Sequence, residues 1–193
     1  MTASVETPDA VLAVAAAQGD EAAFGIIMRR HKGWLYRFIR HYVADRDEAY
    51  DVLQDSFVSV WAALRRYDPE RPFAVWLRRI ALNKCRDRAR RNAVRRAAFT
   101  LLGLEDMGAT PAADQIAASG EALRRLEAAI AKLPRRLKEP LILTALEGLS
   151  QREAGALLGI SAKAIETRAY RGRKQLAAEL DRDDILELVA APV

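Results

Sequence analysis

No stretch of this chain alternates polar and apolar residues with a period of two, and that absence limits its fold more than any other feature. A half-buried β-strand needs such alternation. Alanine, leucine, arginine and glutamate dominate the sequence, whereas valine, isoleucine and threonine are sparse. This composition favours helices, and the sequence therefore predicts an all-α protein.

Helix start and stop signals divide the chain into two groups of helices. Asp20 and Asp45 are placed to cap two long helices, and a loop with two prolines over 67–72 precedes a further helix over 73–96. The helical spacing of apolar residues is lost over 101–118 and returns after it. We therefore predict two small helical domains joined by a flexible linker, in the order 1–96, linker 97–118, 119–180 and an acidic-apolar tail over 181–193. The tail could fold onto a domain, bind a regulator or remain unstructured.

Basic residues are concentrated in two blocks, although the net charge of the chain is only +5. The first block, over 65–96, has twelve bases and three acids, and the second covers 163–174. An acidic stretch over 97–121 separates them. Two basic patches suggest two contacts with one polyanion such as a nucleic acid. The alternative is two solvated helix faces.

The sequence argues against a membrane protein, a secreted protein and an enzyme. The longest uncharged apolar run covers only residues 10–17, and a bilayer-spanning helix needs roughly 20 residues. The N-terminus lacks the basic start of a signal peptide, and the single cysteine forms neither an intramolecular disulfide nor a zinc site. We therefore expect a cytoplasmic protein without bound metal or cofactor. With two histidines and no glycine-rich phosphate loop, we expect no catalysis.

The segment over 150–180 has the spacing of a helix-turn-helix. Ser150 and Glu153 form a capping box at the start of a short helix. Gly159 can supply a left-handed turn, and Ser161 can cap a second helix that ends near Leu180. Apolar and small residues of the second helix share one inner face, at Ile165, Ala169, Gly172 and Leu176. Two helices joined by a three-residue turn are typical of a DNA-binding unit.

The outer face of that second helix is polar and basic. Its members lie at helical spacing and are Lys163, Thr167, Tyr170, Arg171 and Lys174. A recognition helix needs such a face to enter the major groove, and Arg168 and Arg173 flank it within reach of phosphates. The alternative is an ordinary amphipathic hairpin with a solvated basic face.

The expected helix over 46–66 has an apolar inner face and an acidic outer stripe. The outer stripe consists of Asp47, Asp51, Gln54, Asp55 and Val58. Because acidic side chains repel DNA, this stripe suits a protein partner.

The helix over 73–96 has a basic stripe, and aromatic residues lie near its start. The stripe consists of Arg79, Asn83, Arg86 and Arg90, and the aromatic residues are Tyr67, Phe73 and Trp76. Aromatic rings beside arginines can stack unpaired bases while the arginines hold the backbone. Core packing is the alternative for these aromatics, and we expect it mainly for Trp61 and Trp76.

Four motifs in this order resemble those of a known family. The run 47–61 resembles the pattern D-A-E-D-L-x-Q-E-x-F-x-x-x-W, and 73–83 resembles F-x-x-W-L-x-x-I-A-x-N. The Leu-Pro-Arg-Arg-Leu run over 133–137 and the helix-turn-helix complete the series. The chain resembles the extracytoplasmic-function (ECF) sigma factors of bacterial RNA polymerase, which contain sigma regions 2 and 4. The resemblance covers roughly 10–96 and 119–180.

The resemblance implies an alternative sigma factor that binds core RNA polymerase and directs promoter recognition, strand opening and transcription initiation. It implies that the β′ clamp helices of the polymerase contact Asp47, Asp51, Gln54, Asp55 and Val58. It implies that the melted minus-ten element contacts Tyr67, Arg71, Phe73, Trp76, Arg79, Asn83, Arg86 and Arg90. It implies that the minus-thirty-five element, as duplex, contacts Lys163, Glu166, Thr167, Arg168, Tyr170, Arg171 and Lys174. It also implies an anti-sigma factor as a regulatory partner.

Two residues depart from the family's pattern. Glu166 stands where lysine or arginine is usual, so it either orients Lys163 or accepts a hydrogen bond from a cytosine amino group. Gly155 stands where isoleucine is frequent, and we expect looser packing of the first helix there. A stand-alone helix-turn-helix regulator is the competing hypothesis, but such a protein would not need the acidic stripe over 47–58.

Overall fold

The computed structural model describes residues 7–43, 45–101 and 121–180, and every regular element among them is a helix. The predicted all-α fold is confirmed. The chain divides into two compact units, Met1–Pro111 and Ala112–Val193. None of the described helices is both long enough and apolar enough to cross a membrane.

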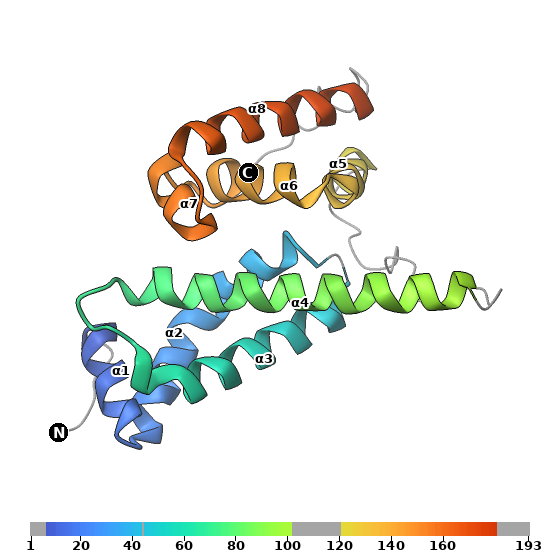
Figure 1. Cartoon of the computed structure of the whole chain (residues 1–193). Coiled ribbons are helices and arrows are strands. Elements are labelled where there is room, and N and C mark those ends of the chain that lie inside the picture. The colour runs from blue at the N-terminus through green and yellow to red at the C-terminus, as the bar shows by residue number, and fades with distance from the viewer. Residues whose placement is uncertain (1–6, 44, 102–120, 181–193) are drawn as a thin grey trace. The chain divides into compact units, whose positions relative to one another are not determined.

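The described residues of the first unit form four α-helices and one 3₁₀ turn (Figure 1). The elements are α1 (Asp9–Ala17), α2 (Glu21–Arg40), α3 (Arg46–Ala63), η1 (Leu64–Arg66) and α4 (Phe73–Leu101). Helix α2 packs against α1, α3 and α4, and η1 packs against α1. The predicted caps are present, because Asp20 accepts a hydrogen bond from the N–H of Ala23 at 2.9 Å and Asp45 accepts one from the N–H of Glu48 at 2.8 Å.

The core of the first unit combines residues from all four helices. Its fully buried large side chains are Leu12, Ile27, Leu35, Phe38, Ile39, Val52, Val60, Leu77 and Leu82. Trp61, expected in this core, is 39% exposed, and the centre of its ring lies 4.9 Å from that of Phe24. The expectation of a mainly buried Trp61 is therefore wrong.

Helix α4 is longer than the sequence predicted. It continues to Leu101, so the first residues of the expected linker over 97–118 are helical. The physical reason is local, since Ala97 and Ala98 favour helix and the first glycine after them is Gly103. The rest of that linker and the tail over 181–193 lie outside the described residues.

The second unit consists of α5 (Glu121–Lys132), α6 (Arg135–Leu141), a π-helical turn η2 (Ile142–Leu146), α7 (Gln151–Leu158) and α8 (Ala162–Glu179). Helix α8 packs against α5, α6 and α7. Gly172 lies at the α6–α8 crossing, where a Cβ atom would lie 3.3 Å from the carbonyl oxygen of Leu137. The missing side chain lets the two helices approach closely, and this fixes the orientation of α8 within the unit.

Candidate functional site

The predicted helix-turn-helix is formed by α7 and α8. Ser150 Oγ accepts a hydrogen bond from the N–H of Glu153 at 3.2 Å, and Glu153 Oε2 accepts one from the N–H of Ser150 at 2.8 Å. Gly159 has a left-handed backbone with φ 72°, and the Ser161 side chain caps α8 through the N–H of Ala164 at 3.2 Å. The capping box, the glycine turn and the Ser161 cap therefore form as predicted.

The expected loose packing at Gly155 is wrong. Gly155 is buried, and a Cβ atom there would lie 2.6 Å from the carbonyl oxygen of Ile160. The carbonyl of Gly155 also accepts hydrogen bonds from the N–H groups of Gly159 and Ile160, at 2.8 and 3.1 Å. The turn folds tightly back over this residue, so glycine makes the motif more compact.

The outer face of α8 is exposed as a polar surface. Exposed members are Lys163, Thr167, Tyr170, Arg171 and Lys174, and half-buried ones are Glu166 and Arg168. Lys163 Nζ lies 2.8 Å from Glu166 Oε2, and the hydroxyl of Thr167 donates to the carbonyl oxygen of Lys163 at 2.9 Å. The phenol ring of Tyr170 is an exposed aromatic surface in the middle of this face. Together these side chains can meet the edges and phosphates of duplex DNA.

The acidic stripe of α3 is also exposed. All five predicted members, Asp47, Asp51, Gln54, Asp55 and Val58, are solvent-accessible. The buried residues of α3, among them Val52 and Phe57, lie on its other side. Val58 is 68% exposed, so the accessible stripe contains one apolar side chain among its polar ones.

A group of residues that the sequence analysis missed joins α3 to α4. Arg88 Nη2 lies 3.0 Å from Glu48 Oε1, and Asn92 Nδ2 donates to Glu48 Oε2 at 3.1 Å. Arg88 and Asn92 lie about one and two turns after the buried Cys85, on the side by which α4 packs. The helical spacing of Arg88 and Asn92 can be read from the sequence. Their shared partner Glu48 cannot, because it lies 44 residues before Asn92.

The basic stripe of α4 lies on an accessible face, whereas the aromatics before it are largely covered. Arg79, Asn83 and Arg90 are exposed, Arg86 is half-buried, and Arg86 Nη1 donates to Asn83 Oδ1 at 3.3 Å. In contrast, Tyr67 and Phe73 are 8% and 3% exposed, and only Trp76 is half-exposed among the three rings.

The covered aromatics support the loop over 67–72. The Tyr67 ring lies 5.3 Å from that of Phe73 and 5.1 Å from that of Trp76, and its hydroxyl donates to the carbonyl oxygen of Arg71 at 2.6 Å. Burial raises the pKa of Tyr67 above its usual value, so the phenol remains a hydrogen-bond donor at neutral pH. Arg71 is exposed and pairs with Asp68 at 3.2 Å. The loop thus presents Arg71 outward and keeps its rings inward.

A hydrogen-bonded chain ties α1 to α2 beside these rings. His31 Nε2 lies 2.9 Å from Asp9 Oδ2, Trp34 Nε1 donates to His31 Nδ1 at 2.7 Å, and Arg30 pairs with Asp9. Because Nδ1 accepts from the indole, the neutral ring carries its proton on Nε2. Burial lowers the pKa of His31, and the nearby Arg30 lowers it further, against an opposing effect of Asp9.

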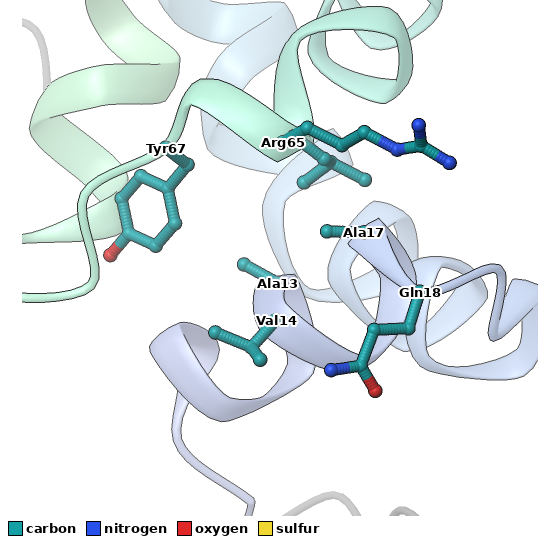
Figure 2. Close-up of a pocket in the computed structure, with 7 residues that line it drawn as sticks. Ala13, Val14, Ala17, Gln18, Arg65 and Tyr67 are labelled. Carbon is teal, nitrogen blue, oxygen red and sulfur yellow. The ribbon is translucent and has the colours of Figure 1, made fainter.

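A hollow of about 550 Å³ opens between α1 and η1 (Figure 2). Its walls are formed by Ala13, Val14, Ala17, Gln18, Leu64, Arg65 and Tyr67. No carboxylate, histidine or cysteine lines it, so it offers no acid–base pair to a substrate.

Each of the two units matches a known protein family model. A model of sigma-70 region 2 matches residues 27–95, and a model of sigma-70 region 4 matches residues 123–176. The RNA polymerase sigma factor CnrH of Cupriavidus metallidurans is 40% identical over 185 residues, covering 92% of this chain and 97% of that protein. The ECF RNA polymerase sigma factor SigE of Mycolicibacterium smegmatis is 33% identical over 172 residues, covering 85% of this chain and 65% of that protein.

A solved structure of CnrH in complex with the cytosolic domain of CnrY is also similar. It matches with a TM-score of 0.65 and 38% identity, covering 91% of this chain and 98% of that one. The region 2 match includes α3 and most of α4, and the region 4 match includes α7 and most of α8. The chain therefore belongs to the ECF sigma factors of the sigma-70 family, alternative sigma factors that bind core RNA polymerase and promoter DNA to direct transcription initiation and are not enzymes.

Proposed function

We propose that the three exposed faces divide the work of this sigma factor between polymerase, melted DNA and duplex DNA. The observation that carries this division is their charge, because one accessible face is acidic and two are basic. A basic face attracts DNA, and an acidic face repels it. Each face is thereby suited to one class of partner.

The acidic stripe of α3 is proposed to bind the β′ clamp helices of core polymerase. It consists of Asp47, Asp51, Gln54, Asp55 and Val58, all of them exposed. Exposed carboxylates around one apolar side chain resemble an interface in which charges orient a partner and the apolar centre is buried.

Charge reversal at the centre of the stripe tests this role. The variant with Asp51→Arg and Asp55→Arg should lose affinity for core polymerase while its helix content stays unchanged. Both side chains are more than half exposed, so the free energy of unfolding should change by about 1 kcal/mol or less. Affinity can be measured by biolayer interferometry and helicity by circular dichroism. Full retention of core binding would refute the assignment.

The loop over 67–73 and the stripe of α4 are proposed to hold the melted non-template strand of the minus-ten element. The exposed or half-exposed candidates are Arg71, Trp76, Arg79, Asn83, Arg86 and Arg90. The rings of Tyr67 and Phe73 support the loop from inside, so we propose a role in shaping this surface for them. Trp76 has the most accessible ring of the three and is the candidate for stacking on a base.

Strand opening can be separated from duplex binding by a pre-melted template. Alanine variants of Arg79, Asn83 and Arg86 should bind core polymerase normally and fail to open a closed promoter. A template with an unpaired bubble at the minus-ten element should restore part of their transcription, because it removes the energetic cost of opening. Run-off transcription on matched closed and bubble templates measures this. No restoration, or a loss of core binding, would contradict the role.

The outer face of α8 is proposed to bind the minus-thirty-five element as duplex. The helix-turn-helix presents Lys163, Glu166, Thr167, Arg168, Tyr170, Arg171 and Lys174 on one side. The hydroxyl of Thr167 donates to its own helix, so its methyl group is the part offered to a base.

We also propose that the protein acts in the cytoplasm and is regulated by a protein that binds it. Core polymerase and promoter DNA are cytoplasmic partners in bacteria, which supports the first point. The similar structure of CnrH was solved with the cytosolic domain of CnrY, which supports the second. An anti-sigma factor is the regulator expected for a sigma factor of this class.

A further inference from the structure

The acidic stripe of α3 is not an independent surface, because arginines of α4 reach over it. Arg88 Nη2 lies 3.9 Å from Asp51 Oδ2, and Arg91 Nη2 lies 3.9 Å from Asp55 Oδ2. The guanidinium of Arg88 also pairs with Glu48 at 3.0 Å. The two central carboxylates of the stripe are therefore already faced by cations of the same chain.

These ion pairs are of two kinds. The Glu48–Arg88 pair is half-buried and is reinforced by the hydrogen bond from Asn92, so it holds the two helices together. The pairs of Asp51 and Asp55 are long, and both carboxylates are more than half exposed. Long, exposed pairs contribute little and exchange readily with other partners.

The Arg91 side chain itself is mostly exposed, although its neighbours Arg88 and Asn92 are bound to Glu48. No side chain between Ala89 and Ala98 is buried among the residues that the structure describes, and the last turns of α4 run past the end of α3 in Figure 1. The contact of Arg91 with Asp55 is therefore mainly electrostatic.

We propose that Arg91, assisted by Arg88, competes with core polymerase for Asp55 and Asp51. The competition rests on the proposed polymerase contact of the α3 stripe. A partner that presents lysine or arginine to these carboxylates must displace the arginines of α4. The free chain thus keeps its polymerase-binding stripe partly neutralised, and polymerase binding releases Arg91 from α3 for contact with an anion such as a DNA phosphate. Polymerase and DNA binding favour each other by this exchange.

Removing the competing cation tests the proposal. The full chain with Arg91→Gln should bind core polymerase, without DNA, about two- to fivefold more tightly than the unchanged chain, the range expected for one exposed ion pair. Arg95→Gln is the matched control, since Arg95 is an exposed arginine one turn further along α4 and pairs with no acid among the described residues. It removes the same charge from the same helix and should leave the affinity unchanged.

A double-mutant cycle with Asp55→Asn separates the two proposals. Asp55→Asn alone should weaken core binding, and adding Arg91→Gln to it should give no gain, because the competed carboxylate charge is absent. If Asp55→Asn leaves the affinity unchanged, the polymerase contact of Asp55 is wrong and the competition falls with it. If Asp55→Asn weakens binding but Arg91→Gln binds no more tightly than Arg95→Gln, the contact stands and the competition is overturned.

Discussion

A single carboxylate interrupts the cationic first half of α8. Glu166 is held 2.8 Å from Lys163 Nζ through its Oε2 atom. The nearby lysine reduces the repulsion that a carboxylate would otherwise meet near phosphates, although the pair is exposed and contributes little to stability. A second role is open to the same residue, since glutamate can accept a hydrogen bond from the amino group of cytosine.

Variants of this pair distinguish the two roles on a set of duplexes with single substitutions in the minus-thirty-five element. If Glu166 only orients Lys163, as the ion pair favours, Glu166→Ala should change the affinity for every duplex alike. Loss of preference at one base pair, worth roughly 1–3 kcal/mol, would instead show that Glu166 contacts a base. Lys163→Ala is the companion variant, and it should weaken all duplexes and lower the salt slope by about one unit.

At the scale of elements, the helix caps and the tight turn were predicted from neighbouring residues. The caps at Asp20, Asp45 and Ser150 and the glycine turn at Gly159 were all predictable, because each acts within a few positions of itself. Local helix propensity also explains why the end of α4 was placed too early, since no breaker precedes Gly103.

Contacts between distant segments were not predictable. The pairing of Glu48 with Arg88 depends on how α3 crosses α4, and one sequence contains no measure of that crossing. The burial of Tyr67 and Phe73 depends likewise on α1 and α2, whose His31 ring lies 5.5 Å from that of Phe73. A pattern of aromatics beside arginines therefore predicted a candidate surface but could not tell which rings face outward.

The tie between α1 and α2 should make the first unit sensitive to acid. Burial lowers the pKa of His31 below 6.5, so the unfolded chain binds a proton more readily than the folded one. The contribution of His31 to the free energy of unfolding is therefore fully present above pH 6.5 and is lost as the pH falls below that value. Protonation of Nδ1 also removes the acceptor that Trp34 uses.

Urea denaturation at pH 5.5, 6.5 and 7.5 measures this dependence. The free energy of unfolding should fall with pH in the unchanged chain and fall less steeply in His31→Gln. Burial also lowers the pKa of His41, so His41 adds to the same pH dependence of the free energy of unfolding. His41→Gln is therefore the control for losing any histidine, and this variant should keep the pH dependence that His31 causes. Equal slopes for the unchanged chain and His31→Gln would show that this tie does not titrate.

At the scale of the whole molecule, the chain joins two compact units that each present a basic face. Two modest contacts on one chain bind one DNA molecule more tightly than either alone, because the second contact forms at a high effective concentration. Each unit has a core of its own, one around Phe38 and one around Leu141.

The separate cores predict that damage to one unit spares the other. Gly155→Ala forces a Cβ atom to within 2.6 Å of a backbone oxygen and should cost at least about 2 kcal/mol in the second unit. Hydrogen exchange of the full chain should then speed up in α7 and α8 and stay unchanged in α2 and α3. Gly33→Ala is the control, since a Cβ there would meet only the tip of the Arg37 side chain at 3.8 Å. Faster exchange in both units would mean that they unfold together.

The continuity of α4 gives it a rotational phase that must be kept. Each residue of an α-helix turns the chain by about 100°, and α4 runs without a break from its buried first half to the arginines beyond Cys85. One inserted alanine after Cys85 would leave the helix intact but swing Arg88, Arg91 and Asn92 away from α3. Seven inserted residues make close to two full turns, so these side chains would again point toward α3, but further along the helix axis. An insertion in this helix therefore rotates the residues after it about the helix axis as well as moving them along it. The number of residues between Cys85 and Arg91 is constrained by both effects.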